Sequence, residues 1–331
     1  MTHRASSALL LAVAFWLAAT AAQAAGVRLF DVPAAKAIRT LAGAVWYPCA
    51  ALQEQTSAGG RTIIGTQDCP LVGDKLPLIV ISHGREGWFG GHHATAAALA
   101  DAGFIVAAIS HPGDNASDKS RVGDLSVLVD RPVDIKRLID FMLGAWPDAP
   151  KIDRERIGLF GYSMGGYTGL VVIGAEPDFR KGVPGCEGST FRACEQLRNN
   201  ELPTEPLTHD PRVKAAVIVD PGPSIFFPAD SLKAVKVPVQ LWSSDPKLSS
   251  SYVSGCCGLG LRSRLPSSPD FRLASNAIHF SFLPPCSATE MQEFPRICAD
   301  APGFDRVAFH KDFDATVLVF FRKHLVGTGK P

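Results

Sequence analysis

Short apolar runs that recur along the chain constrain its fold more than any other feature. Residues 76–81 read LPLIVI and residues 104–109 read FIVAAI, and two further runs follow at 214–219 and 237–242. A strand that is apolar at every position is buried on both faces, as in a parallel sheet between two layers of helices. Helical patterns separate these runs. The sequence therefore predicts an α/β fold with a mostly parallel, doubly wound sheet.

The expected elements alternate over most of the chain. Strands are expected at residues 27–32, 42–47, 61–66, 76–81, 104–109, 156–160, 214–219, 237–242 and 271–277. Helices are expected at residues 92–102, 130–146, 164–173 and 309–325. Residues 176–212 do not fit the alternation, because they are rich in proline, glycine and charge and are too long for an ordinary connection. We interpret 176–212 as an inserted cap at the mouth of the sheet, with a plain surface excursion as the alternative.

A G-x-S-x-G motif, GYSMG at residues 161–165, stands where an expected strand meets an expected helix. This is the setting in which the motif forms a nucleophile elbow. Gly161 and Gly165 let the strand and the helix pass closely, so the turn can present the hydroxyl of Ser163 above the carboxyl edge of the sheet. We therefore interpret Ser163 as a nucleophile rather than as part of a tight turn.

A serine nucleophile needs a histidine base, and in this fold the histidine follows the serine in the chain. His279 stands in NAIHFSF, directly after the last expected strand, where a loop can bring it over Ser163. The other downstream histidines lie in the irregular segment or in the C-terminal helix: His209, His310 and His324. We assign His279 as the base.

The orienting carboxylate has two candidates. Asp220 ends the apolar run AAVIVD, and Asp245 follows the run PVQLWSS. Both positions lie at the carboxyl end of an expected strand, where a carboxylate can reach the imidazole. Proteins of this architecture often take the acid after the later strand, which favours Asp245, and the residues alone leave both candidates open.

Two backbone N–H groups are candidates for an oxyanion hole. One belongs to Met164, at the start of the helix that follows the elbow. The other belongs to Arg85 in the loop SHGREGWFGG, whose glycines allow close approach of the backbone. In the same loop we interpret His83 as structural. The cluster SHPGDN at 110–115 lacks partners for a metal site, so we expect none there.

The N-terminus has the form of an export signal. His3 and Arg4 precede an apolar run at residues 8–19, and Ala22-Gln23-Ala24 fits a small-x-small cleavage site. The run is shorter than the roughly 20 residues of a membrane-spanning helix. We predict a signal peptide at residues 1–24, a single domain at 25–331, no membrane span in the mature chain, and a periplasmic or secreted location.

Eight cysteines agree with export, because an even number after a signal peptide favours disulfides over free thiols. Proximity in the sequence suggests three pairs: Cys49–Cys69, Cys186–Cys194 and Cys286–Cys298. Cys256 and Cys257 could form a vicinal pair or bond elsewhere. The charge is close to balanced, with a net charge of +1, and the basic residues are scattered, so nucleic acid is not an expected partner.

The order of these motifs resembles a known family. The segments LPLIVISHGREGWFGG, GLFGYSMGGY, VIVDPGPSIFFP and HFSFLPPC are similar to the α/β-hydrolase branch that contains bacterial predicted dienelactone hydrolases and platelet-activating factor acetylhydrolases. The resemblance runs from about residue 76 to 325 and weakens at 176–212 and 243–270. It implies ester hydrolysis through a Ser–His–Asp triad without a cofactor, with Ser163, His279 and, as in the acetylhydrolases, Asp220.

The resemblance also limits the substrate. Dienelactone hydrolases use a cysteine nucleophile, whereas this chain has Ser163, which argues against dienelactone. We expect an exported serine ester hydrolase acting on a small-molecule ester. The alternatives are an amidase, thioesterase or acyltransferase with the same triad, or a hydrolase-fold protein that binds a ligand without turnover.

Overall fold

The protein is described by a computed structural model that places residues 24–34, 39–248 and 258–327. Its centre is a nine-stranded sheet with the order β11-β10-β9-β8-β6-β7-β2-β1-β5. The strands are β1 (Ala24–Val32), β2 (Leu41–Cys49), β5 (Thr66–Gln67), β6 (Leu76–Ser82), β7 (Ile105–Ile109), β8 (Ile152–Tyr162), β9 (Val213–Val219), β10 (Val239–Ser244) and β11 (Asp270–Ala274).

The sheet is parallel from β7 through β6, β8, β9 and β10 to β11. On the other side, β2 runs antiparallel to β7, and β1 runs antiparallel to β2. The parallel strands end at one common edge of the sheet. That edge carries the segments after β6, β8, β9 and β11 in which the sequence placed its candidate residues. The prediction of a mostly parallel sheet is confirmed.

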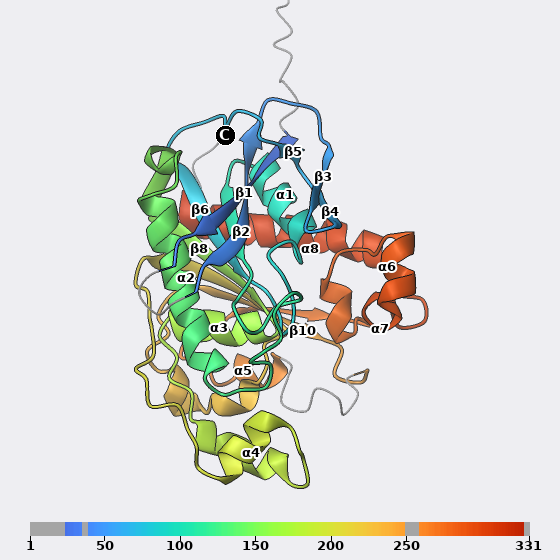
Figure 1. Ribbon diagram of the computed structural model, residues 1–331. Coiled ribbons are helices and arrows are strands. Elements are labelled where there is room, and N and C mark those ends of the chain that lie inside the picture. The colour runs from blue at the N-terminus through green and yellow to red at the C-terminus, as the bar shows by residue number, and fades with distance from the viewer. Residues whose placement is uncertain (1–23, 35–38, 249–257, 328–331) are drawn as a thin grey trace, which may run out of the picture.

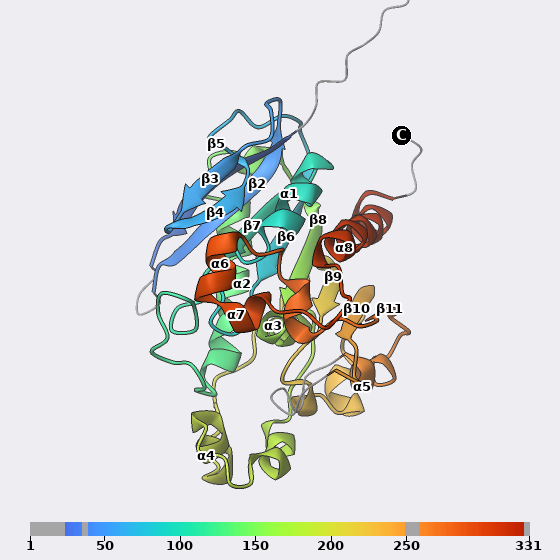
Figure 2. The same cartoon turned by 90° about the vertical axis from the view of Figure 1, so that its right-hand side faces the viewer.

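Helices cover both faces of the sheet (Figures 1 and 2). The helices are α1 (His93–Asp101), α2 (Val127–Leu143), α3 (Met164–Val172), α4 (Arg192–Arg198), α5 (Leu259–Arg262), α6 (Ala288–Glu293), α7 (Pro295–Cys298) and α8 (Arg306–Phe321), with a π-helical turn at Arg322–Val326. Buried side chains of α2 and α3 pack on one face of the sheet, and those of α1 and α8 pack on the other.

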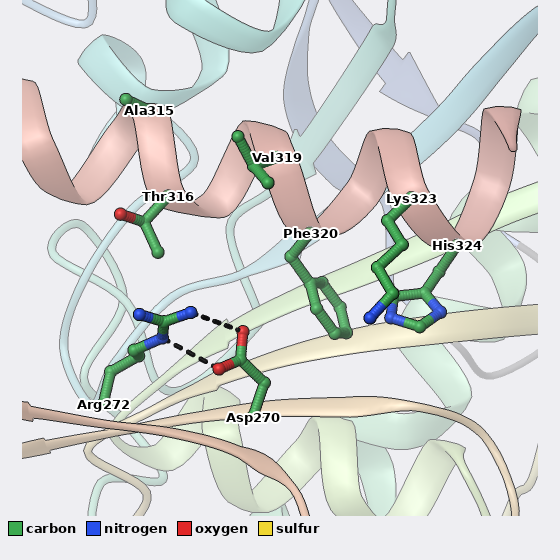
Figure 3. A pocket seen from close by; sticks show the side chains of 8 residues that line it. All are labelled: Asp270, Arg272, Ala315, Thr316, Val319, Phe320, Lys323 and His324. Atoms are coloured by element: carbon green, nitrogen blue, oxygen red, sulfur yellow. Dashed lines mark hydrogen bonds and ion pairs between the residues drawn. The ribbon is translucent and has the colours of Figure 1, made fainter. Parts of the chain in front are cut away.

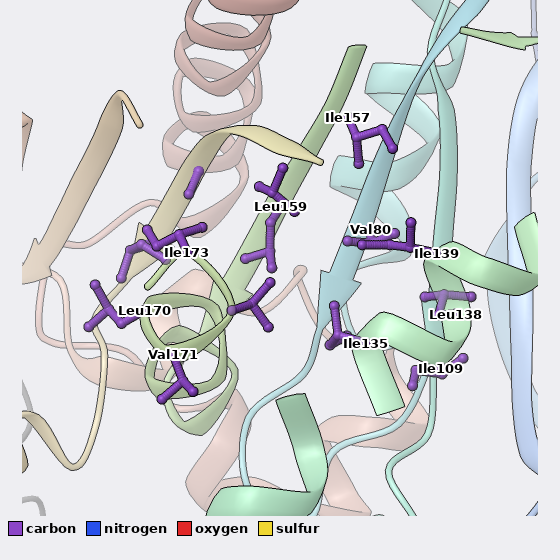
Figure 4. Close-up of a cluster of buried hydrophobic side chains, with 14 of the residues drawn as sticks. Val80, Ile109, Ile135, Leu138, Ile139, Ile157, Leu159, Leu170, Val171 and Ile173 are labelled. Carbon is purple, nitrogen blue, oxygen red and sulfur yellow. The ribbon is translucent and has the colours of Figure 1, made fainter. Parts of the chain in front are cut away.

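The apolar strand residues predicted to be buried on both faces are buried in this way. Figure 4 shows Val80, Ile157 and Leu159 of the strands against Ile135, Ile139 and Leu170 of α2 and α3. On the opposite face, Ile79, Ile81 and Phe160 pack with residues of α1 and α8. Each largely apolar strand thus feeds two separate cores. Burial of this apolar surface stabilises the folded chain by about 25 cal/mol per Å², and it holds the helices against the two faces of the sheet.

The strand expected at residues 61–66 is wrong as one element. It is divided into β4 (Arg61–Ile64), which pairs with β3 (Gln55–Ala58) in a separate hairpin, and β5, which pairs with β1. Gly65 separates the two at a φ of +144°, a conformation that favours glycine. The β3–β4 turn uses Gly59 and Gly60, both at positive φ. That pair of glycines was the signal for the missed hairpin.

Residues 176–212 form a projection at the end of the molecule, drawn in yellow-green in Figure 2, and its residues Cys186 and Leu197 belong to the same hydrophobic core as α2 and α3. It contains a 3-10 helix at Phe179–Cys186 and helix α4. The expected disulfides are present: Cys186–Cys194 within the projection, Cys49–Cys69 and Cys286–Cys298. Cys256 and Cys257 lie outside the described residues.

The predicted signal peptide at residues 1–24 also lies outside the described part of the chain, except for Ala24. From Ala24 onward the chain is strand β1, and Ala24 and Ala25 are buried against β2. Within the described ranges, no helix combines the length and the apolar character needed to cross a membrane.

Candidate active site

Ser163 stands at the turn between β8 and α3. Its backbone has φ +54° and ψ −119°, a strained conformation for a residue with a side chain. The N–H of Ser163 still donates to the carbonyl of Val219 on β9 at 2.9 Å, so the sheet holds the turn. The residue is partly exposed, and its hydroxyl lies at the carboxyl edge of the sheet. The strand–turn–helix setting predicted for GYSMG is therefore present.

The glycines on either side of Ser163 are required by close backbone contacts. A Cβ on Gly161 would overlap the carbonyl oxygen of Gly165. A Cβ on Gly165 would overlap the carbonyl oxygen of Ser82 at the end of β6. Because these neighbours are backbone atoms, they cannot move aside as a flexible side chain would. Gly161 and Gly165 thus allow the sharp turn that raises Ser163.

His279 lies over Ser163 and contacts the candidate nucleophile directly. Its Nε2 is 3.0 Å from the Oγ of Ser163, and its Nδ1 is 2.7 Å from Oδ2 of Asp220. A carboxylate can only accept, so Nδ1–H donates to Asp220 and Nε2 is left to accept from the serine hydroxyl. The Asp220 side chain is fully buried, whereas 13% of the His279 side chain is exposed. The structure thus brings Ser163, His279 and Asp220 into one hydrogen-bonded line.

Two neighbours that the sequence did not point to hold this line. Ser244, at the end of β10, donates its N–H to Oδ1 of Asp220 at 3.0 Å and its hydroxyl to Oδ2 at 2.8 Å. Tyr162 donates its hydroxyl to the carbonyl of His279 at 2.9 Å, and its ring stacks on the imidazole with centroids 5.0 Å apart. Both residues could have been suspected, because Tyr162 adjoins Ser163 and Ser244 ends the strand beside β9.

Asp245, the alternative acid, has a different place. Its carboxylate accepts the N–H groups of Lys247 and Asn276, both at 3.0 Å, and these bonds lower its pKa below the ordinary value. Its own N–H donates to the carbonyl of Ala277 at 2.9 Å. Asp245 therefore shapes the turn before His279, and Asp220 is the carboxylate in contact with the imidazole. The general preference for the later strand pointed to Asp245, whereas the contact with the imidazole is made by Asp220.

The other downstream histidines are also placed elsewhere. His209 contacts the carbonyl of Val171 at 2.6 Å, and His324 lies in the C-terminal π-helical turn against Phe320. His310, on α8, contacts the carbonyl of Ser281 at 3.0 Å. His310 therefore supports the segment that carries His279 without reaching Ser163.

A partly buried ion pair also supports the His279 segment. His279 opens the 3-10 helix His279–Phe282, in which the hydroxyl of Ser281 donates to Oδ1 of Asp300 at 2.7 Å. Arg306 holds both oxygens of Asp300, at 2.8 and 2.9 Å. The side chain of Arg306 is 5% exposed and that of Asp300 is 18% exposed. The loop with the candidate base is thus tied to α8.

The two candidate oxyanion donors lie near Ser163. Met164 is the first residue of α3, so its N–H has no partner within the helix. Gly84, just before Arg85, packs against the elbow, because a Cβ built on it would lie 3.3 Å from the Cβ of Ser163. Within the described part of the chain, neither the N–H of Met164 nor that of Arg85 donates to an acceptor.

His83 orients the peptide that carries the N–H of Arg85. The backbone N–H of His111 donates to Nε2 of His83 at 3.0 Å, so the ring proton is on Nδ1. Nδ1–H donates to the carbonyl of Gly84 at 2.6 Å, and the N–H of Gly87 donates to the same oxygen at 3.1 Å. In a trans peptide the N–H points opposite to the C=O. The N–H of Arg85 is therefore directed away from the interior of the loop.

His83 is neutral in this position. Burial lowers its pKa well below the ordinary value of 6.5, and the nearby charge of Arg131 lowers it further. His111 behaves in the same way, with a pKa lowered first by burial and then by Arg131. Its ring contacts Ser82 and Asp134, and Asp114 pairs with Arg131. Among the described residues, no group of three or more potential ligands is arranged to hold a metal ion.

The projection at 176–212 contacts this loop through the ring of Phe191. The guanidinium of Arg85 lies over Phe191 at 5.5 Å from the ring centroid. The projection is fixed beside the loop by an ion pair of 2.6 Å between Arg192 and Asp124, and by a bond of 2.9 Å from the N–H of Leu125 to Gln196. These contacts place Phe191 next to one of the two candidate donors.

A surface hollow of about 490 Å³ lies elsewhere, between β11 and α8 (Figure 3). Its polar side chains include Asp270, which forms two hydrogen bonds with Arg272 at 2.8 and 3.2 Å, and Lys323. None of Ser163, His279 and Asp220 lines this hollow. This hollow is therefore separate from the three candidate catalytic residues.

Comparisons with known proteins agree with this fold. The family described as serine aminopeptidase, S33, matches residues 74–184, which include the loop after β6 and the elbow. Platelet-activating factor acetylhydrolase from Canis lupus familiaris is 28% identical, with 38% of each chain covered. The chain thus spans well under half the length of this curated relative.

Two solved structures resemble the whole chain. Ferulic acid esterase from Streptomyces cinnamoneus has a TM-score of 0.64 at 18% identity, covering 95% of this chain and 93% of the esterase. Dienelactone hydrolase from Anabaena variabilis has a TM-score of 0.51 at 14% identity, covering 91% of this chain and 99% of that hydrolase. At such low identity the likeness concerns the fold.

Proposed function

Because the chain has the α/β-hydrolase fold, we propose that it is an exported serine hydrolase that cleaves carboxylic esters of small molecules through Ser163, His279 and Asp220. The observation that carries the proposal is the hydrogen-bonded line of these three side chains, with contacts of 3.0 and 2.7 Å. The line stands on a strained elbow at the carboxyl edge of the sheet. A turn with no chemical role has no need of a histidine and a buried carboxylate in this order.

The geometry supports a two-step reaction. The hydroxyl oxygen of Ser163 attacks the ester carbonyl carbon while its proton passes to Nε2 of His279. Asp220 holds the imidazole by Nδ1 and stabilises the imidazolium. The C–O bond to the leaving group breaks, and the departing alcohol takes the proton from His279. Water then gives a proton to Nε2 of His279 and attacks the acyl carbon. The bond from this carbon to the oxygen of Ser163 breaks, and His279 returns the proton to that oxygen, which releases the acid and restores Ser163.

The charge that develops on the carbonyl oxygen needs donors. The N–H groups of Met164 and Arg85 are the candidates. The first lies at the positive end of α3, and the second is directed outward by the fixed carbonyl of Gly84. Removing one such donor in a serine hydrolase costs about 10²–10³ in kcat. We assign the oxyanion hole to these two groups.

An ester fits the surroundings better than a peptide with a free N-terminus, although the matched family is described as serine aminopeptidase. A free α-amino group calls for an unpaired carboxylate near the nucleophile. The carboxylate in the loop beside Ser163 is Glu86, and it is held by Lys119 at 2.9 Å and by Arg85 at 4.0 Å. Glu86 is therefore already neutralised by cations.

Replacement of Ser163 by alanine tests the proposal. The variant should lose about 10³-fold or more of the activity toward short p-nitrophenyl esters, because the nucleophile is absent. A fluorophosphonate probe should label the wild type and not the variant. Labelling at another residue, or near wild-type turnover by Ser163→Ala, would overturn the assignment.

Export is part of the proposal. Three disulfides join residues that are 20, 8 and 12 positions apart, and such bonds persist in oxidising compartments. Mass spectrometry of the mature protein should find an N-terminus at Ala25, after the predicted cleavage site. A mature chain that keeps residues 1–24 would contradict this step.

A further inference from the structure

A buried ion pair lies beneath the loop that carries Arg85. It joins Arg131 of α2 to Asp114, which follows β7, with 2.6 Å between Nη1 and Oδ2. Each side chain is only 1% exposed. Buried ion pairs are costly to desolvate and are weak evidence for a stabilising role. The pair also has no part in the proposed proton transfers, so its presence calls for another explanation.

The pair forms hydrogen bonds with the backbone of the loop on both sides of Arg85. Arg131 donates through Nη2 to the carbonyl oxygen of His83. Asp114 accepts the N–H of Glu86 at Oδ1, at 3.0 Å. The chain of contacts therefore runs from residue 83 through Arg131 and Asp114 to residue 86. The peptide between Gly84 and Arg85 lies between these two anchors.

The backbone at one anchor is strained. Glu86 has a φ of +57°, which side-chain residues other than asparagine and aspartate rarely adopt. Such a conformation persists when surrounding contacts determine it, and strain of this kind gathers at functional sites. Here the contact is the bond from its N–H to the buried carboxylate of Asp114. Without that bond the peptide after Gly84 can relax and turn the N–H of Arg85 away.

We propose that Arg131 and Asp114 are positioning residues for the oxyanion hole. They hold the loop from His83 to Glu86 so that the N–H of Arg85 stays aimed at the carbonyl oxygen of the substrate. This inference rests on the proposed function. It adds a residue of α2, far from Ser163 in the sequence, to the machinery of the site.

The test compares an ester with the matching thionoester, in which sulfur replaces the carbonyl oxygen. The tetrahedral intermediate of a thionoester carries its charge on sulfur, which is larger and a weaker hydrogen-bond acceptor. An enzyme with an aligned oxyanion hole therefore prefers the ester, and this preference shrinks when a donor is misaligned. Lower stability or a smaller active fraction changes both rates equally and leaves their ratio unchanged.

The main variant replaces both charges together, as Arg131→Met with Asp114→Leu, because no unpaired charge then remains buried. Arg131→Lys is the second variant, since one ammonium group cannot reproduce the fork that joins Asp114 to the carbonyl of His83. The control is Arg306→Met with Asp300→Leu, the partly buried ion pair behind His279. Thermal melting of each protein shows which variants are folded at the assay temperature.

We expect kcat of the main variant for the ester to fall by about 10–100-fold with little change in KM. The ratio of the ester rate to the thionoester rate, which is the ester preference, should fall by about tenfold. Arg131→Lys should keep part of that preference. The control pair should slow both substrates by the same factor. If the main variant does not fold, the ratio of ester to thionoester rates in Arg131→Lys tests the positioning role instead.

An unchanged ester preference in a folded Arg131 variant, with Ser163 still labelled by the probe, overturns the positioning role alone. An equal loss of preference in the control pair also overturns it, because the effect is then not specific to this loop. Failure of the proposed function looks different, since the wild type itself then shows no turnover that depends on Ser163.

Discussion

Two loops flank Ser163, and each presents a histidine to the site in a different way. His279 faces Ser163 with Nε2 and a buried carboxylate with Nδ1, and it is partly exposed. His83 faces a backbone N–H with Nε2 and a backbone carbonyl with Nδ1, and it is buried beside Arg131. The same side chain is thus ready to take up a proton in one loop and is held neutral as a fixed donor in the other.

The difference lies in burial first and then in the charge of the neighbours. Asp220 stabilises an imidazolium, which a general base must become during the reaction. Arg131 and burial oppose a charge on His83, so that ring cannot act as a base near neutral pH. We call the loop that carries His279 the acid–base loop and the loop from His83 to Glu86 the oxyanion loop. In the proposed mechanism, the acid–base loop transfers the proton and the oxyanion loop fixes the direction of the Arg85 N–H. Substitutions in one loop should therefore leave the kinetic property that depends on the other loop unchanged.

The largest effect is expected from Asp220. In Asp220→Asn the amide can donate to Nδ1 of His279, so the imidazole adopts the wrong tautomer and Nε2 can no longer accept the proton of Ser163. We expect kcat to fall by about 10⁴-fold, as for the aspartate of other serine triads. Steady-state hydrolysis of a p-nitrophenyl ester measures this loss.

Asp245→Asn is the control for that experiment, because its side chain is partly exposed and contacts the turn at Asn276 instead of His279. It should keep activity within a few-fold of wild type. A larger loss from Asp245→Asn than from Asp220→Asn would reverse the assignment of the acid.

A third histidine, His92, tests the cost of burying an imidazole without a partner. Its ring packs against Phe160 and Tyr162, and neither ring nitrogen has a hydrogen-bond partner among the described residues. Burial lowers its pKa to about 3. The unfolded chain takes up a proton below pH 6.5 and the folded chain does not, so the free energy of unfolding falls as the pH drops from 6.5 toward 3.

His92→Phe should remove this dependence. Relative to wild type, its free energy of unfolding should improve by about 3 kcal/mol on going from pH 7 to pH 4, since one pKa unit corresponds to 1.36 kcal/mol. Urea unfolding at the two pH values measures it. The same substitution at the partly exposed His324 should give a much smaller change. A pH-independent difference at His92 would contradict the assignment of a neutral, buried ring.

The sequence predicted the acid–base loop better than the oxyanion loop. The sequence paired Ser163 with His279, which the structure brings within 3.0 Å of each other, because the elbow motif has a fixed local pattern and few histidines follow it. The central strands were found because burial on both faces leaves a continuous apolar run. The acid was ambiguous, because Asp220 and Asp245 both end strands. Their distances to His279 depend on a turn that sequence patterns do not encode.

The supports of the oxyanion loop were not predicted. Arg131 stands in an otherwise amphipathic helix and resembles a surface residue, and Asp114 was considered only as part of a polar cluster. Their pairing joins α2 to the segment after β7, and it exists only once the sheet has brought β6 and β7 side by side. Long-range polar contacts of this kind leave no periodic pattern in the sequence. The buried face of α2 carries two charged residues, Arg131 and Asp134, and charges in these positions were the one signal available.

His83 offers a smaller test within the oxyanion loop. His83→Ala removes the donor to the carbonyl of Gly84 and should lower kcat by about tenfold, because the Arg85 peptide is less well fixed. His83→Asn can place an N–H near the former Nδ1 and should recover part of the loss. The acid limb of the pH profile of kcat/KM should be the same in both variants, since burial and the charge of Arg131 keep His83 neutral there. An acid limb that shifts with His83 would mean that the two loops share the proton.

The smallest effect is expected where the projection meets the oxyanion loop. Phe191 contacts the guanidinium of Arg85, while the proposed donor is the backbone N–H of that residue, so loss of the ring leaves the donor in place. A cation–π contact at an exposed position is worth about 0.5–1 kcal/mol. Phe191→Ala should therefore change KM by about two- to fivefold and leave kcat nearly unchanged. A cycle with Arg85→Ala and the double variant isolates the coupling between the two side chains. A loss of kcat of about 100-fold in Phe191→Ala would contradict this expectation. The projection would then help to fix the oxyanion loop, and the roles could no longer be divided between the two loops beside Ser163 alone.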